Sequence, residues 1–173
     1  MTQHRHPHHQ RLGPQDSLLD QSPLDLAERT CLETIRHMLH SFAAPQSQAW
    51  MAAFRCADAG FAPATGPLIA TQAMRYIDEV RKSRISVFHF NSAACPPCAA
   101  VLTEHERRLM LALHWARRGH PARARLELML LCEGNEIAHA MARLTALSRA
   151  LPAAADAASG PAQTAALHPG APR

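Results

Sequence analysis

Apolar residues recur every three or four positions along most of the middle of the chain, which is the spacing of one face of an α-helix. The first such stretch follows Ser22 and Pro23, which are residue types favoured at a helix N-cap and at the first helical position. Its apolar positions are Leu24, Ala27, Cys31, Ile35, Met38 and Phe42. The pattern predicts a first helix that begins at Pro23.

Two more helices are predicted before residue 85. The second follows Pro45, presents Trp50, Phe54 and Ala57 on one face, and ends near Gly60. The third follows the turn at residues 65–67, and its apolar positions are Ile69, Ala73, Ile77 and Val80. Both show the three-and-four spacing of a helix with one buried face.

The second half of the chain predicts three helices. Thr103 and Glu106 form the T-x-x-E pattern of a capping box, so a helix should run from there to about Arg118. Another should span residues 121–133 and end at Gly134, and the last should have Asn135 as its N-cap. The sequence therefore predicts an all-α fold, a bundle of about six helices.

One segment has the composition of a strand rather than a helix. Residues 85–90, ISVFHF, are rich in β-branched and aromatic side chains. Because a lone strand is unstable, this segment should either lie extended on the helices or pair with its copy in a homodimer. Residues 91–98, NSAACPPC, should form a loop after it.

The two ends of the chain differ in composition from the middle. Residues 1–22 are polar and rich in His, Pro and Gln, and residues 152–173 are mostly Ala, Pro and Gly. Neither end has enough apolar side chains to offset the entropy of ordering it. We therefore predict a disordered His-rich arm at 1–22, one helical domain at 23–151, and a disordered Ala/Pro-rich tail at 152–173.

The chain has neither the about 18 consecutive apolar residues of a membrane span nor the apolar segment of a signal peptide. Its cysteines form an odd set without an export signal, which argues against a disulfide framework. They are Cys31, Cys56, Cys95, Cys98 and Cys132. We expect a cytoplasmic protein with reduced thiols and no membrane partner.

Cys95-Pro96-Pro97-Cys98 is the motif that most directly suggests chemistry. Two thiols at this spacing can bind one zinc ion or form a redox pair. A structural zinc site needs four ligands, and no second Cys-x-x-Cys exists in the chain. The remaining ligands would have to come from a second subunit or from the candidates His89, His105, Cys132 and His139.

The position of the next helix should separate the two interpretations of this motif. A helix that begins at Pro96 would make Cys95 its N-cap, where the helix dipole favours a thiolate and thus redox chemistry. A helix that begins at Thr103 would leave both cysteines in a loop. The capping box at Thr103 favours the second arrangement.

The excess positive charge lies in one region. The formal net charge is +4, and residues 84–125 hold seven arginines against two glutamates. Six of these arginines are candidates for binding an acidic protein partner or phosphate: Arg107, Arg108, Arg117, Arg118, Arg123 and Arg125. A helix-turn-helix motif centred on Gly134 does not fit, because Leu130 occupies the position that requires a small side chain.

The sequence shows no phosphate-binding loop, nucleophile elbow or zinc-protease motif. It favours a small non-enzymatic regulatory or adaptor protein, in which a zinc-binding or thiol-sensing turn lies next to a basic helix pair that binds an acidic partner. The alternative is a thiol or metal-dependent oxidoreductase that uses Cys95 and Cys98. A thiol pKa well below that of an ordinary cysteine would distinguish this enzyme from a regulatory protein. A nucleic-acid-binding regulator is the third candidate.

Overall fold

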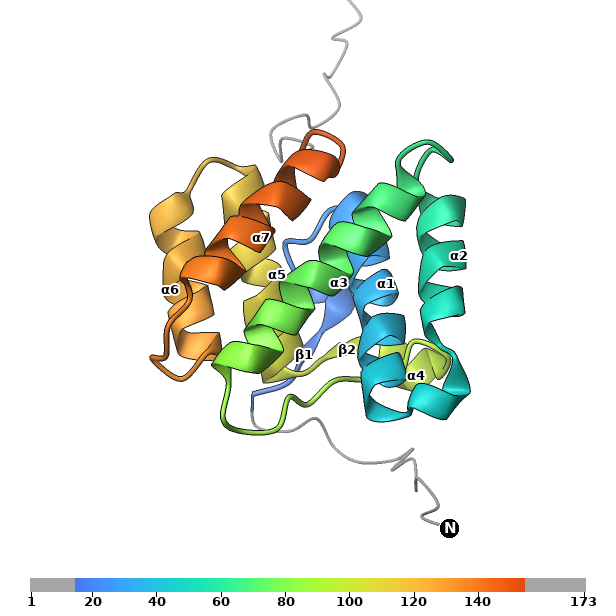
Figure 1. Cartoon of the computed structure of the whole chain (residues 1–173), viewed down its shortest axis with the longest axis horizontal. Helices are drawn as coiled ribbons and strands as arrows, with labels where there is room; N and C mark the ends of the chain where they lie inside the picture. The colour runs from blue at the N-terminus through green and yellow to red at the C-terminus, as the bar shows by residue number, and fades with distance from the viewer. Residues whose placement is uncertain (1–14, 155–173) are drawn as a thin grey trace, which may run out of the picture.

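The computed structural model describes residues 15–154, which contain seven α-helices and a two-stranded sheet (Figure 1). Six helices are long and one is a single turn, so the predicted all-α bundle of about six helices is confirmed. They are α1 (Leu26–Ala43), α2 (Trp50–Gly60), α3 (Gly66–Ser83), α4 (Pro96–Ala99), α5 (Glu104–Arg117), α6 (Pro121–Leu131) and α7 (Ala138–Ala150). Most of the predicted arm and tail lies outside the described residues. No described helix has both the length and the apolar character needed to cross a membrane.

The long helices form two groups that share one core. Helices α1, α2 and α3 contact one another, α5 and α6 form a hairpin, and α7 packs against both α3 and α5 (Figure 1). Fully buried side chains from both groups meet in one cluster, including Ile35 of α1, Tyr76 of α3, Leu113 of α5 and Leu144 of α7. The predicted apolar faces are therefore the buried ones, except that Trp50 at the start of α2 is 49% exposed.

Helix α1 begins three residues later than the sequence pattern predicts. Asp25 is the N-cap, and its carboxylate accepts a hydrogen bond from the Glu28 N–H at 2.9 Å while the Glu28 carboxylate accepts one from the Asp25 N–H at 2.9 Å. Ser22 instead donates to the Leu19 carbonyl and closes a short 3₁₀ turn at Leu19–Gln21. The prediction of Ser22 as N-cap is wrong because the capping box at Asp25 satisfies two backbone groups reciprocally.

The turn between α6 and α7 is only partly as predicted. Gly134 has φ +78°, a conformation that glycine adopts at little cost, and it follows the end of α6. Asn135 does not cap the last helix, which begins at Ala138. Its side-chain amide donates to the Ser83 carbonyl at 2.9 Å, so it fastens this turn to the end of α3 instead.

Residues 85–90 form no strand: residues 85 and 86 are a bend, and residues 87–90 have no regular secondary structure. Phe88 and Phe90 pack against the core, whereas Ile85 is 87% and Val87 is 73% exposed. The strand-like composition thus belongs to a connecting segment that packs two of its aromatic side chains against the core.

The sheet within residues 15–154 lies where no strand was predicted. Strand β1 (Ser17–Leu18) pairs antiparallel with β2 (Val101–Leu102), and the Leu19 N–H donates to the Ala100 carbonyl at 2.9 Å. Residues 17–19, which lie in the predicted disordered arm, are therefore held by backbone hydrogen bonds to a distant part of the chain. Residues 1–14 lie outside the described range.

Candidate functional site: the dithiol turn

The two cysteines of the C-x-x-C motif lie on the single helical turn α4, which we call the dithiol turn (Cys95–Cys98). Helix α4 begins at Pro96 with Cys95 as its N-cap, and α5 begins separately after the capping box at Thr103. The prediction that residues 91–98 form a loop is wrong for Pro96 to Cys98, because both prolines suit the first turn of a helix. Each predicted arrangement is therefore observed in part: Cys95 is the N-cap of a four-residue helix, and the long helix begins after the predicted capping box at Thr103.

The Sγ atoms of Cys95 and Cys98 are 2.8 Å apart. A disulfide bond is about 2.05 Å long, so the two sulfurs form a close pair of thiols. None of the five cysteines is part of a disulfide. Cys95 is buried and Cys98 is partly exposed, so Cys98 is the thiol that a reagent in solution reaches first.

A buried guanidinium fixes the downstream end of the dithiol turn. Arg36 of α1 donates to the carbonyls of Ala99 at 2.8 Å and Val101 at 2.6 Å, directly after Cys98. It also binds both carboxylate oxygens of Glu106 at 2.7 and 3.0 Å, and these two side chains are 3% and 0% exposed. The Arg36–Glu106 pair therefore ties α4 to both α1 and α5.

The upstream side of the turn is fixed to the same carboxylate. The Asn91 N–H donates to Glu106 Oε1 at 3.0 Å, and the Asn91 side-chain amide donates to the Val101 carbonyl at 2.8 Å. Glu106 also accepts from the Thr103 N–H at 2.9 Å as part of the capping box. One buried carboxylate thus positions the chain before and after the two cysteines.

The pKa of Cys98 is raised above its ordinary value of 9.0. The first cause is the hydrogen bond with Cys95, because removing the Cys98 proton would place negative charge against the neighbouring sulfur. Burial adds to this effect, while the Arg36 guanidinium opposes it. Burial also raises the pKa of Cys56 and Cys132, and it raises that of Cys31 to about 12. Cys98 is therefore mainly protonated near neutral pH.

Replacing Cys95 with serine is expected to speed alkylation of Cys98 by iodoacetamide several-fold near neutral pH. The substitution removes the neighbouring sulfur that raises the Cys98 pKa, so more Cys98 is present as the reactive thiolate. In the unmodified protein, the rate should still be rising as the pH passes the ordinary thiol value of 9.0. Residue-resolved mass spectrometry measures the rate, and Cys56→Ser serves as the matched control that leaves it unchanged. Equal Cys98 rates with and without Cys95 would contradict the expectation.

Two of the three candidate histidines, His89 and His105, contact each other. The rings of His89 and His105 are stacked with centroids 5.4 Å apart, and His105 Nδ1 accepts from the His89 N–H at 2.9 Å. Its Nε2 faces the Arg84 guanidinium at 3.3 Å. Burial and the positive charge of Arg84 lower the pKa of His105.

The residues predicted to complete a zinc site are not assembled in one chain. Cys132 is fully buried at the C-terminal end of α6. Within residues 15–154, no three or more His, Cys, Asp or Glu side chains form a group that could hold a metal ion. Among residues 15–154, Cys95 and Cys98 thus have no third ligand beside them, and a structural zinc site needs four. Zinc binding stays a prediction.

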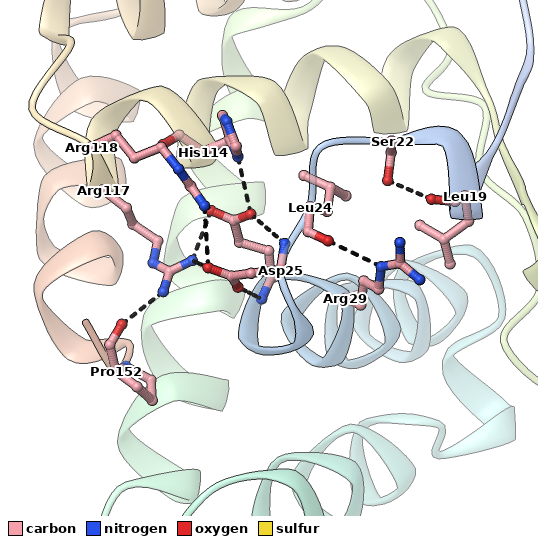
Figure 2. A network of polar contacts seen from close by, with 10 residues as sticks. Leu19, Ser22, Leu24, Asp25, Arg29, His114, Arg117, Arg118 and Pro152 are labelled. Atoms are coloured by element: carbon pink, nitrogen blue, oxygen red, sulfur yellow. Dashed lines mark hydrogen bonds and ion pairs between the residues drawn. The ribbon is translucent and has the colours of Figure 1, made fainter. Parts of the chain in front are cut away.

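Two of the six candidate arginines bind acidic residues of the same chain at the start of α1. Figure 2 shows Arg117 and Arg118 at the end of α5 pointing toward Asp25, with His114 on the same side. Arg117 binds Asp25 and Glu28 at 2.7 Å each, and Arg118 binds the same two residues at 3.3 and 2.6 Å. The Arg117 side chain is only 1% exposed and also binds the Pro152 carbonyl at 2.7 Å. These guanidiniums connect α1, α5 and the end of the described chain.

The other four candidate arginines lie nearer the surface. Arg108 is paired with Glu104 at 2.8 Å and with Glu127 at 3.5 Å. Arg107 lines a mostly apolar cavity of about 170 Å³ between β1 and α5. Neither Arg123 nor Arg125 forms an ion pair within the described part of the chain, and both are exposed. The unpaired positive charge is thus smaller than the sequence suggests.

Comparisons with known proteins give no match to this chain, whether with family models, with curated proteins or with solved structures.

Proposed function

We propose that this protein is a small non-enzymatic regulatory protein whose dithiol turn is a thiol–disulfide switch. The observation that carries the proposal is the 2.8 Å separation of the Cys95 and Cys98 sulfurs on a turn held by buried hydrogen bonds. Closing this distance to a bond of about 2.05 Å requires a sulfur movement of less than about 1 Å. The fold therefore supports both the reduced and the oxidised state.

The oxidant in this proposal is a low-molecular-weight disulfide such as oxidised glutathione. The Cys98 thiolate attacks one sulfur of that disulfide, which forms a mixed disulfide and releases one external thiol. The Cys95 thiolate then attacks Cys98 Sγ and releases the second external thiol. In total, two protein thiols and one external disulfide become one protein disulfide and two external thiols. A reducing glutathione pool reverses the step.

The raised pKa of Cys98 favours a switch over a catalyst. Fast thiol–disulfide oxidoreductases have a nucleophilic cysteine whose pKa is lowered, often at a helix N-terminus. Here the partly exposed thiol, Cys98, is the third residue of α4, and its pKa is raised instead of lowered. An oxidoreductase that uses Cys95 and Cys98 is therefore the second candidate.

The position of the dithiol turn supports a structural response to oxidation. Ala99 and Val101, which follow Cys98, accept the hydrogen bonds of Arg36, and Ala100 accepts the one from Leu19. A new covalent bond between Cys95 and Cys98 constrains the same turn. We infer that oxidation changes how firmly α4 and the β1–β2 pair are held.

Equilibration with glutathione redox buffers tests the switch. As the fraction of oxidised glutathione rises, we expect the protein to lose about 2 Da, the mass of two thiol hydrogens. Peptide mapping should place the new disulfide between Cys95 and Cys98. The change should be absent from Cys98→Ser and retained in Cys56→Ser, the matched control.

Two results would contradict the proposal. If Cys95 and Cys98 both remain reactive toward an alkylating reagent at every ratio of reduced to oxidised glutathione, no switch exists. Repeated turnover of a protein disulfide substrate with a dithiol reductant, lost in Cys98→Ser, would favour the oxidoreductase instead.

A further inference from the structure

Helix α6 is apolar on two opposite sides. Its inner side, formed by Ala124, Leu128 and Leu131, is fully buried in the core. On its outer side, Leu126 is 56%, Met129 39% and Leu130 51% exposed. A helix that packs on one core normally has polar residues on its outer face. Folding of the described chain thus leaves this apolar outer stripe without a packing partner.

Arginines border the stripe. At about 100° of rotation per residue, Arg123 and Arg125 fall on opposite sides of the line through Leu126 and Met129. The Arg123 guanidinium lies 4.5 Å from the centre of the Trp115 ring, which orients it without neutralising its charge. The described part of the chain supplies no carboxylate to either arginine. We call Arg123, Arg125, Leu126, Met129 and Leu130 the α6 face.

We infer that the α6 face binds an acidic amphipathic helix of a partner protein. The apolar side of such a helix would cover Leu126, Met129 and Leu130, and its carboxylates would lie against Arg123 and Arg125. Charge complementarity selects this partner, because the stripe is bordered by positive groups on both sides. Arginine and methionine are also enriched in protein interfaces.

The same charges argue against two other occupants. A second copy of the chain would bring the arginines of two α6 faces into one interface, where like charges cost free energy. An anionic membrane would need a longer apolar face, because helices that lie in a membrane surface bury apolar side chains over several turns. The stripe from Leu126 to Leu130 spans little more than one turn.

The probe for this inference is a fluorescein-labelled synthetic helix of about 18 residues, long enough for several helical turns. It carries leucines at helical spacing on one face and glutamate, glutamine and alanine elsewhere. Fluorescence anisotropy with the fully reduced protein should show saturable binding that weakens as salt is added. A scrambled peptide of the same composition and a peptide with lysine in place of glutamate should not bind. Reduced protein is used so that failure of the thiol switch leaves this result unaffected.

Two double variants test the face itself. Leu126→Gln/Met129→Gln and Arg123→Gln/Arg125→Gln should each weaken binding about tenfold, and the arginine variant should also lose much of the salt dependence. The altered side chains are exposed, so the fold should be retained. Leu68→Gln is the matched control, because Leu68 on α3 is 49% exposed and should not affect binding.

Each of four results would overturn the inference. One is equal binding of the acidic helix and the lysine peptide, and another is unchanged affinity in both double variants. The third is a dimer, seen by sedimentation equilibrium, that Leu126→Gln/Met129→Gln dissociates. The fourth is co-sedimentation with phosphatidylserine vesicles that the same variant abolishes, in the absence of peptide binding.

Discussion

Replacing Arg36 with methionine is expected to lower the free energy of unfolding by about 3–5 kcal/mol. The substitution keeps an unbranched apolar stem but leaves the carboxylate of Glu106, which is 0% exposed, without its opposite charge. It also removes the donors that bind the Ala99 and Val101 carbonyls. Guanidinium denaturation followed by circular dichroism at the helix band measures the loss.

Two further variants show whether the unpaired charge is the cause. Adding Glu106→Gln to Arg36→Met should restore part of the stability, since the amide is uncharged and glutamine can still form the capping box. Asp20→Asn is the control, because Asp20 is 92% exposed in its pair with Arg29 and its loss should not change stability measurably. A double variant no more stable than Arg36→Met alone would show that the buried charge is not responsible.

Replacing Glu28 with glutamine is expected to destabilise the fold by about 3 kcal/mol. The Glu28 carboxylate is fully buried and binds Arg117, Arg118 and the His114 ring, at 2.7, 2.6 and 3.1 Å. Glutamine has nearly the same shape, so the substitution tests charge rather than packing. Among the described residues it leaves Asp25 as the only carboxylate paired with the Arg117 and Arg118 guanidiniums, and the Arg117 side chain is 1% exposed (Figure 2).

Denaturation of Glu28→Gln should be compared with that of Glu33→Gln. Glu33 is exposed on the same helix and forms no ion pair with the described residues. Both substitutions replace a glutamate with a glutamine, so the change in charge and in helix propensity is the same. The two sites differ in the burial of the carboxylate and in its ion-pair partners. Similar losses of stability in both variants would contradict the role assigned to the Glu28 carboxylate.

The helices could be predicted from the sequence because their signals are local. In α3 and α5, the residues that face the core themselves create the spacing of three and four, and the capping box of α5 lies within four residues. The start of α1 was missed because two local signals compete there. Ser22 and Pro23 fit a helix start, but the reciprocal bonds of Asp25 and Glu28 determine it.

Pairings between distant residues could not be predicted in this way. Strand β1 has only two residues, and four α-helices separate it in the chain from its partner β2. Arg117 and Arg118 were interpreted as surface charge, because nothing in their own segment shows that Asp25, 92 residues from Arg117, would bind them. For the cysteines, spacing identified the pair, whereas the 2.8 Å contact and the raised Cys98 pKa depend on the folded turn.

The buried charges of α1 have a consequence for synthesis of the protein on the ribosome. Their partners all come from α5: Arg36 and Glu106 are 70 residues apart, Glu28 and His114 are 86 apart, and Asp25 and Arg118 are 93 apart. While α1, α2 and α3 leave the exit tunnel, Glu28 and Arg36 have no opposite charge to pair with, and burying them alone would cost several kcal/mol each. The nascent chain therefore keeps one side of α1 in water until α5 emerges. In the order of translation, α5 is the element that supplies the partners of these charges, and α6 and α7 follow it to complete the core.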